Sequence, residues 1–448
     1  MAMVVKNNMS AISTLNTLNK NSSALAKSLE KVSSGMKING AADDASGYAI
    51  SERMRVQIRG LDQANANTQN GNAMMKVAEG AVSSTVDILK TLKEKVINAA
   101  NDTNTDADRQ TIQKELDQSI DQIDDNANIT YNGKYLVDGS HNNKVTQTST
   151  HLTNESLGKN QTSNTNFTEL TNRTGDKLNI QTGDTVTVSY VKNGKTYSTS
   201  AVIGVKVNNL DEVLSKLTGQ NGGEKGDKLS DVMEFTSSGT ATYKIGTDAS
   251  GQAVYTADKG CAITLRAKTG GVEGQIAGFT ISISNKNGAI NKSANAALDN
   301  FSETIRAENT SADNAMVFQV GTKANQAIKV GLTDMRSTAL GLKGFDGQTL
   351  SVSTQVKANA AINVLDNAIQ KALDQQTTIG SVESRLSYTS SNLTTASENV
   401  QSSESTIRDA DMAKEMTNYT KNNVLLQAAQ SMLAQANQSS SSVLSLLQ

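Results

Sequence analysis

Small and apolar residues between Ala358 and Val400 recur at alternating intervals of three and four positions. This spacing predicts a helix that packs lengthwise against other helices, with one continuous apolar face. At about 1.5 Å per residue the helix is roughly 65 Å long, too long to be buried in an ordinary globular domain. It therefore needs partner helices of similar length. The face consists of Ala358, Ala361, Leu365, Ala368, Ala372, Gln375, Ile379, Val382, Leu386, Thr389, Leu393, Ala396 and Val400.

The N-terminal part of the chain offers such partners. The same spacing predicts one amphipathic helix that reaches about Ser33, a second from Ala45 to about Asn101, and a third that follows the polar break after Asn101. The expected apolar faces hold Leu15, Leu18, Leu25, Leu29 and Val32 in the first helix, Leu89, Leu92 and Val96 in the second, and Ile112, Leu116, Ile120, Ile123 and Ala127 in the third.

A glycine-rich segment, SSGMKINGAADDASG, separates the first two helices. Three glycines in so short a span predict a non-helical link. Asp43 and Asp44 then stand where a helix N-terminus favours hydrogen-bond acceptors and negative charge. The same two carboxylates could belong to a metal or acid/base site, but no His, Cys or second acidic cluster lies nearby, so capping is favoured.

The C-terminal segment, from Val400 to Gln448, has helical propensity to its end. One predicted face carries Leu425, Ala428, Met432 and Ala436, while Val443, Leu444 and Leu447 contribute to an apolar tip. The opposite face is rich in Gln and Ser and almost uncharged.

The middle of the chain has a different pattern. After about Ser140 the residues are mostly Ser, Thr, Asn and Gly, and apolar residues alternate with polar ones around Val186–Tyr190, which indicates strands. Asn193-Gly194 predicts a hairpin turn. We expect a helix at about 294–307 and a strand pair within 316–332. The fold class is therefore mainly α: a long antiparallel coiled-coil bundle formed by both termini, with an inserted β-rich (α+β) outer domain.

Composition excludes several functional classes. The net charge is −2, so the chain has no broad basic field for nucleic acid or anionic lipid. No apolar run approaches the length of a membrane span, and the N-terminus lacks the apolar stretch of a cleaved secretory signal. Pro is absent, and Cys261, the only cysteine, permits no intramolecular disulfide. An inert Cys261 is favoured over a reactive one.

The sequence offers little material for catalysis. It contains no Gly-rich phosphate loop, no CxxC and no HExxH motif. Its two histidines, His141 and His151, lie in a polar tract, where we expect solvated loop residues and not metal ligands. We therefore expect no enzymatic activity, no cofactor and no metal.

Several motifs resemble those of bacterial flagellin. Residues 33–39 (SSGMKIN) with 42–47 (ADDASG) are similar to the family signature, whose residues here include Ser34, Gly35, Asn39, Asp43, Asp44 and Gly47. The likeness covers about 1–140 and 313–448, and no match can be placed in 141–312, where this family has a variable outer domain. The further matching segments are 58–61 (IRGL), 131–133 (YNG), 136–139 (LVDG), 318–321 (FQVG), 405–413 (STIRDADMA), 432–438 (MLAQANQ) and 443–447 (VLSLL).

The resemblance implies an extracellular structural subunit that assembles with copies of itself into the helical filament of the bacterial flagellum. It implies inner-tube helices and the N-terminal link in 1–43 and 404–448, a coiled-coil rod with a β-hairpin in 44–140 and 313–403, and a variable outer domain in 141–312. The residues expected to pack in the bundle or the filament are Leu15, Leu18, Leu25, Leu29, Val32, Leu89, Leu92, Val96, Leu365, Ile379, Val382, Leu386, Leu393, Met432, Leu433, Val443, Leu444 and Leu447.

The resemblance also implies partners. Flagellins are exported largely unfolded through the flagellar type III channel, and the export chaperone of the family would bind about 408–448. Cap and junction proteins would contact the filament. No nucleic acid and no membrane is expected among the partners.

One departure from the family concerns Toll-like receptor 5. In flagellins that this receptor detects, the epitope includes an Arg, a Leu and a Glu, and the corresponding positions here hold Thr91, Lys95 and Glu115. A Lys in place of an apolar contact predicts weak receptor activation, because an unpaired charge is unfavourable in a buried contact. Alternatively, Thr91 and Lys95 belong simply to an exposed helix face.

Three other functions compete with the filament subunit. A flagellin-like junction protein between hook and filament shares terminal sequence, but the completeness of both terminal signatures favours the filament subunit. A coiled-coil surface adhesin would require an anchor or a signal peptide. A flagellin with an enzymatic insert is disfavoured, for a protease, by the missing HExxH.

Overall fold

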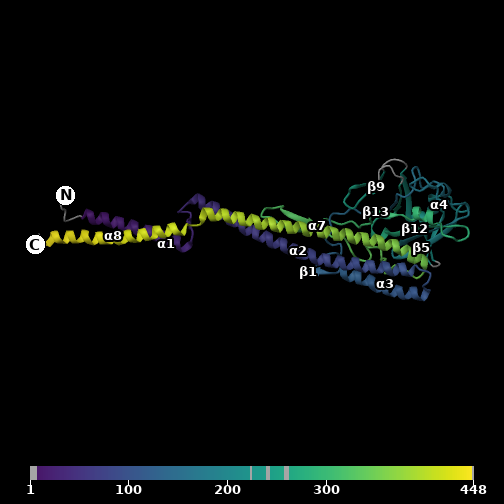
Figure 1. The fold of residues 1–448 in the computed structure, drawn as a ribbon, viewed down its shortest axis with the longest axis horizontal. Coiled ribbons are helices and arrows are strands. Elements are labelled where there is room, and N and C mark those ends of the chain that lie inside the picture. The colour runs from purple at the N-terminus through teal and green to yellow at the C-terminus, as the bar shows by residue number, and fades with distance from the viewer. Residues whose placement is uncertain (1–7, 222–223, 239–242, 257–261, 446–448) are drawn as a thin grey trace. The chain divides into compact units, whose positions relative to one another are not determined.

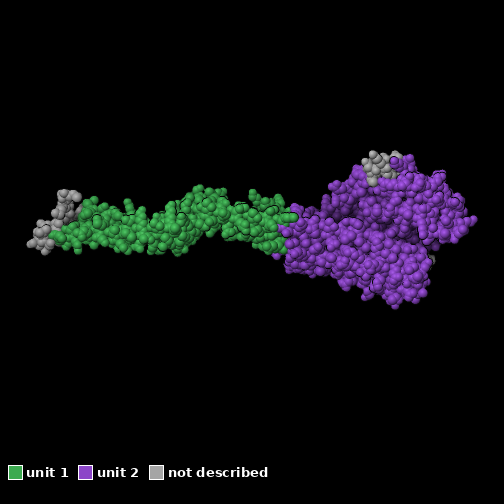
Figure 2. All heavy atoms as spheres, in the orientation of Figure 1, with its two compact units in different colours: residues 1–69, 319–327, 388–448 green, residues 70–318, 328–387 purple. Residues whose placement is uncertain are grey.

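A computed structural model of the chain describes residues 8–221, 224–238, 243–256 and 262–445. The chain divides into two compact units, coloured separately in Figure 2, and each is treated by itself. The first unit comprises Met1–Gln69, Gln319–Ala327 and Tyr388–Gln448, and the second comprises Asn70–Phe318 and Ile328–Ser387.

Long helices form at both ends of the chain, as predicted (Figure 1). The first two end within about two residues of the expected positions, and the third contains the whole face expected of it. The expected unbroken helix from Val400 is wrong, because α7 ends at Arg408 and α8 starts only at Met412. The long helices are α1 (Met9–Ser34), α2 (Ala45–Ala99), α3 (Asp106–Ala127), α7 (Gln355–Arg408) and α8 (Met412–Ser445).

In the second unit, α3 and α7 each run antiparallel to α2. Lys93 of α2 pairs with Asp366 of α7, and Lys95 of α2 pairs with Glu115 of α3 at 3.0 Å. The α7 face that the spacing predicts is buried from Ala358 to Leu386 except at Val382, which is half-buried. Its polar exception, Gln375, is buried too, and its Oε1 accepts hydrogen bonds from the Thr333 amide and hydroxyl at 3.2 and 2.8 Å.

The middle of the chain forms two antiparallel sheets. One has the order β13-β3-β11-β8 and the other β12-β4-β5-β6-β7. The hairpin β4–β5 turns at Asn193-Gly194 as predicted, with φ values of 50° and 71° that fit a primed turn. The strands of the two sheets are β3 (His151–Asn154), β4 (Thr185–Lys192), β5 (Lys195–Val202), β6 (Thr218–Asn221), β7 (Glu224–Lys228), β8 (Met233–Ser238), β11 (Ala262–Ala267), β12 (Ile276–Ser284) and β13 (Ser302–Ile305).

The remaining elements are small. The expected strand pair within 316–332 is present as β14–β15. The short elements are the strands β1 (Thr130–Tyr131), β2 (Lys134–Tyr135), β9 (Lys244–Thr247), β10 (Ala253–Tyr255), β14 (Met316–Gln319) and β15 (Ala327–Val330), the helices α4 (Leu210–Lys216), α5 (Leu229–Val232) and α6 (Lys292–Leu298), and the 3-10 turns η1 (Phe167–Glu169) and η2 (Val272–Gly274).

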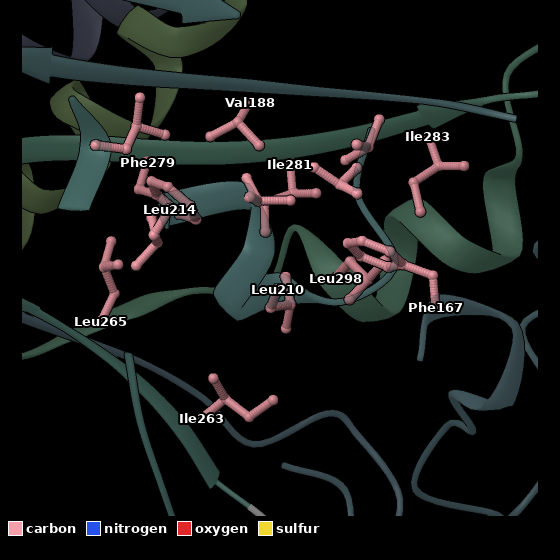
Figure 3. Packing of buried hydrophobic residues seen from close by; sticks show 14 of the residues in the cluster. Phe167, Val188, Leu210, Leu214, Ile263, Leu265, Phe279, Ile281, Ile283 and Leu298 are labelled. Carbon is pink, nitrogen blue, oxygen red and sulfur yellow. The ribbon is translucent and has the colours of Figure 1, made fainter. Parts of the chain in front are cut away.

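One hydrophobic core joins the two sheets and the short helices. Val188 of β4 and Phe279, Ile281 and Ile283 of β12 are fully buried, at alternate positions along their strands as the pleat requires (Figure 3). Leu210 and Leu214 of α4 and Leu298 of α6 pack into the same core, as do Ile263 and Leu265 of β11.

Two expectations for this region are wrong. The helix expected over 294–307 ends at Leu298. The next residue, Asp299, accepts a hydrogen bond from the Ile281 amide at 3.0 Å with its side chain, and the strand β13 follows. His151 is not a solvated loop residue: it is buried in β3, and its Nδ1 lies 2.8 Å from the Ser149 carbonyl oxygen. Cys261 lies outside the described residues.

Truncation of a core residue in β12 should unfold the β-rich middle selectively. We expect Ile281→Ala to lower its free energy of unfolding by about 2–5 kcal/mol, because the fully buried side chain leaves a cavity. Urea unfolding followed by tyrosine fluorescence measures this, since Tyr190 and Tyr197 stack with ring centres 5.2 Å apart. Val205→Ala, at a residue 79% exposed, should change the value by less than about 0.5 kcal/mol. Equal effects of the two substitutions would contradict the packing described here.

Candidate functional site: the terminal helices and their junction

The first unit contains an antiparallel pair of helices from the two ends of the chain, α1 and α8 (Figure 1). Side-chain amides of asparagine join the two helices at the start of α1 and at two points farther along it. Asn8 donates to the Ala436 carbonyl oxygen at 3.1 Å, and Asn21 donates to that of Leu425 at 3.2 Å. Asn422 donates to the Ser28 hydroxyl at 3.0 Å.

Each helix of this pair covers only one face of the other. On α1, Leu18, Leu25 and Val32 are half-buried, whereas Leu15 and Leu29 remain 46% and 52% exposed. The predicted apolar face of α1 therefore divides between a contact with α8 and an open flank. The other exposed apolar residues of α1 are Met9 and Ile12.

The face of α8 that contacts α1 is offset from the apolar face marked in the sequence by Leu425, Ala428, Met432 and Ala436. Leu425 and Met432 are 42% and 63% exposed and Ala428 is exposed, whereas Leu426, Ala429 and Leu433, one position further, are half-buried or buried. Because α8 carries apolar residues on several sides, its periodicity does not distinguish the two faces. Val443 and Leu444 belong to α8, and Leu447 lies outside the described residues. The further exposed apolar residues of α8 are Met412, Met416 and Val424.

The breaks at the end of α1 and at the start of α8 meet each other. Gly35 ends α1 in the left-handed conformation, with φ 71°, and its amide donates to the Lys31 carbonyl oxygen. Beyond it, the Lys37 amide donates to the carbonyl oxygen of Arg408 at 2.7 Å, and the Ala410 amide donates to that of Gly35 at 2.9 Å. Two short segments from opposite ends of the chain thus satisfy each other's backbone groups.

Arg408 occupies the centre of this junction. Its side chain is buried, and its Nη1 donates to Glu52 Oε1 at 2.6 Å and contacts the Ser51 hydroxyl at 3.4 Å. The guanidinium also lies over the Tyr48 ring, 5.4 Å from its centre. The hydrogen bond from Arg408 holds the pKa of the Glu52 carboxyl below its usual value. Nearby, Arg55 pairs with Glu404 at 3.1 Å.

The signature residues shape the link that leads into α2. Asp44 Oδ1 accepts hydrogen bonds from the amides of Ser46 and Gly47, so it caps α2 as predicted. Asp43 Oδ2 accepts from the Asn39 amide at 3.2 Å, and the Ser34 hydroxyl accepts from the Met36 amide at the same distance.

Gly47 and Asn39 are the most constrained of these signature residues. A Cβ on Gly47 would lie 2.5 Å from Asp44 Oδ2 and 2.7 Å from Ile38 Cδ1, so the site has room only for glycine. The side-chain amide atoms of Asn39 are buried and have no hydrogen-bond partner among the described residues.

The other predicted residues lie elsewhere in the structure. Leu89, Leu92, Val96, Leu365, Ile379 and Leu386 are buried in the second unit. Leu393 packs on Leu61 and Ala64 in the first unit. Thr91 is exposed and Lys95 pairs with Glu115, so the three receptor positions are on neighbouring helices of the second unit.

The sequence reasoning missed the role of Arg408 and Glu52. Arg408 stands in the quoted segment STIRDADMA, so its motif was visible, but nothing in the sequence shows that a buried arginine would connect it to α2. Within the described ranges there is no cluster of three His, Cys, Asp or Glu that could hold a metal ion. No helix in that part of the chain is long and apolar enough to cross a bilayer.

Comparison with known proteins agrees with the terminal motifs. The bacterial flagellin N-terminal helical region matches residues 5–142, and the bacterial flagellin C-terminal helical region matches residues 362–447. The flagellin of Clostridium tyrobutyricum is 34% identical, with 97% of this chain and 99% of that one covered. The flagellin of Bacillus subtilis is 30% identical, with coverage of 99% and 100%.

A crystal structure of flagellar hook associated protein-3 from Legionella pneumophila covers 79% of this chain and 97% of its own, at 14% identity and a TM-score of 0.34, which is too low to support an assignment. The whole-chain relatives and the two matched regions do support one. The chain belongs to the bacterial flagellin family, whose members are structural subunits of the extracellular filament of the flagellum.

Proposed function

We propose that the open flank of the α1–α8 pair is the surface by which subunits assemble into the filament. The observation that carries this proposal is the exposure of Leu15, Leu29 and Met432 on helices that are already paired. Exposed apolar residues gathered on one pair of helices are typical of an association surface. Full burial of an exposed leucine contributes about 1.5–3 kcal/mol, and Leu15 and Leu29, about half exposed, have roughly half of that to gain against neighbouring subunits.

This proposal assigns a place to each segment. Residues 1–43 and 404–448 form the inner tube, 44–140 and 313–403 form the surrounding rod, and 141–312 faces solvent. Cap and junction proteins contact the same polymer. The polar and nearly uncharged side of α8, with Gln427, Gln430 and Gln435 exposed, suits a water-filled channel. The subunit acts mechanically, without catalysis, cofactor, nucleic acid or membrane partner.

Export precedes assembly in this proposal. The subunit passes unfolded through the flagellar type III channel, with a chaperone on about 408–448 that shields the exposed apolar residues of α8. A chain without Pro refolds without slow prolyl isomerisation, and one without disulfides needs no oxidation step. Both properties support rapid folding after passage through the channel.

We also infer weak activation of Toll-like receptor 5. Glu115, the one family-like epitope residue, is paired with Lys95 at 3.0 Å. A receptor would have to separate this pair or bury it, and either step is unfavourable.

Substitution on the open flank should block assembly and spare the monomer. We expect Leu29→Gln to raise the critical concentration for polymerisation by about 10- to 100-fold, because the leucine loses its burial between subunits. Electron microscopy and sedimentation measure this, and wild type should form long tubular filaments. Val205→Gln, at an exposed residue of the β-rich middle, is the matched control and should polymerise like wild type. Polymerisation of Leu29→Gln at the wild-type concentration would refute the assignment.

Loss of the Arg408 side-chain charge should loosen the junction. We expect Arg408→Gln to speed hydrogen exchange at the Lys37 amide by about tenfold or more, because Glu52 and the junction backbone lose their central partner. Arg55→Gln, which removes a more exposed ion pair with Glu404, should have a smaller effect. The proposed role of Arg408 is wrong if both variants exchange alike.

Restoring the receptor contacts should raise receptor activation. We expect Thr91→Arg with Lys95→Leu to increase the response of cells that express Toll-like receptor 5 several-fold over wild type, since the double change frees Glu115 and restores an apolar contact. A strong wild-type response that disappears in Glu115→Ala would contradict the inference.

A further inference from the structure

The sequence contains six Asn-Gly pairs, and the structure describes five of them in different surroundings. Asparagine followed by glycine is the dipeptide in which the asparagine side-chain amide is most easily lost. The reason is that glycine has no side chain to hinder attack by its own backbone nitrogen. The pairs begin at Asn39, Asn70, Asn132, Asn193, Asn221 and Asn287, and the glycine that follows Asn221 lies outside the described residues.

Asn132 and Gly133 form the turn between β1 and β2. Both residues are exposed, and their φ values of 51° and 77° fit a primed turn. In the described part of the chain, neither the Asn132 side-chain amide nor the Gly133 backbone amide has a hydrogen-bond partner. A Cβ on Gly133 would meet no atom within 4 Å. The attacking nitrogen and the side-chain carbonyl that it attacks are therefore both open to water.

The β1–β2 hairpin is also easy to open. The Gly133 nitrogen must approach Cγ of Asn132 before a ring can close, so the turn has to leave its folded conformation. The hairpin is a separate two-stranded sheet with two pairs of opposed residues. So short a hairpin is marginally stable by itself, and the free energy of opening it locally is small.

The pair Asn193–Gly194 has the same kind of turn but is held closed. β4 and β5 pair along eight residues of each strand. The loop 344–348 also presses on the turn: Gly194 is buried, and a Cβ on it would lie 2.3 Å from the Gln348 carbonyl oxygen. Ring closure at Asn193 would have to open a long ladder and displace this loop.

The other three described Asn-Gly pairs are protected in different ways. The pair at Asn70 lies inside α2, where the backbone amide that would attack is bonded within the helix. In the pair at Asn287 the attacking amide donates to the Asn285 carbonyl oxygen at 2.7 Å. The side-chain amide atoms of Asn39 are buried. Each of these groups has to be freed or exposed before a ring can close.

We propose that Asn132–Gly133 is a site of spontaneous deamidation, at which the folded subunit loses the side-chain amide faster than at any other described Asn-Gly pair. The Gly133 nitrogen gives its proton to water and bonds to Cγ of Asn132. The bond from Cγ to Nδ2 breaks, and ammonia leaves with a proton returned from water. Water then opens the cyclic imide, at Cγ to give aspartate or at the backbone carbonyl carbon to give isoaspartate. The net reaction consumes one water and releases one ammonia.

The isoaspartate product changes the hairpin. Its main chain runs through Cβ and Cγ, so the two-residue turn gains a backbone atom and no longer has the geometry of a primed turn. We expect the β1–β2 ladder to be lost in this product. The aspartate product keeps the normal backbone and should retain the ladder.

Peptide mapping of the full-length monomer tests the site. After incubation at about pH 8.5 and 37 °C, deamidation measured by mass spectrometry should be at least about tenfold faster at Asn132 than at Asn193, because the two hairpins differ in their free energy of local opening. Asn193 is the matched control, since Gly and Lys follow both asparagines. In urea, where both turns are unfolded, the two rates should agree within about twofold.

Two results would overturn the proposal. One is a folded chain that deamidates at Asn193, or at another described Asn-Gly pair, as fast as at Asn132. The other is a ratio of the two rates that stays the same in urea, because the fold would then not determine it.

The effect on the hairpin has its own measurement. Asn132→Asp carries the charge of the product without the inserted backbone atom, so its amide NMR signals in β1–β2 should stay close to those of wild type. In the isoaspartate fraction of aged wild type, separated by chromatography, the same signals should move to unfolded positions. Unchanged signals in that fraction would contradict the predicted loss of the ladder.

Discussion

A contact between two helices covers one face of each, and this limit governs the terminal helices of the chain. In the pair α1–α8, Ala429 is buried and Leu25 and Leu426 are half-buried, but Leu15 and Met432 remain exposed to solvent. A third or fourth helix must cover such flanks if they are to leave water. In the assembly proposed above, these helices come from other copies of the chain. The incomplete packing of the pair therefore fits the proposed assembly surface, and the asparagine bonds fix the register of the two helices without covering their apolar flanks.

At the junction, α1 and α7 end beside each other. The end of a helix leaves backbone carbonyl groups without partners inside the helix, so both ends need hydrogen-bond donors from elsewhere. Backbone bonds between the segments after Gly35 and around Arg408 satisfy some of them. The buried guanidinium then fixes the geometry, because it needs Glu52 as counter-charge and Tyr48 as a face to lie on. Removal of either partner of such a buried ion pair would leave the other charge buried without a counter-charge, which is strongly unfavourable.

Helix boundaries and faces could be predicted where local chemistry decides them. Capping by Asp44 predicts the start of α2, and the glycine at position 35 predicts the end of α1. Heptad spacing predicts the buried face of α7 between residues 358 and 386. The face of α8 that contacts α1 could not be predicted, because α8 carries apolar residues on several sides and their spacing does not single out one face. The end of α7 at Arg408 could not be predicted either, because it depends on backbone hydrogen bonds to the segment after Gly35, which is distant in the sequence. The strand β13 was missed for the same reason: Asp299 ends α6 by bonding to Ile281 of another element.

The contact of β12 with α7 shows how a β-rich insert can be carried safely by a polymer. An edge strand exposes unpaired carbonyl and amide groups, which invite pairing with a strand of another molecule. In a filament, identical sheets are held at high local concentration, so an open edge would be a persistent hazard. Asn363 and Asn367 occupy two carbonyl groups of β12, and the close approach at Gly278 leaves no space for a further strand there. The two asparagines lie one helical turn apart, which matches two residues of an extended strand, so a single helix face can cover the edge.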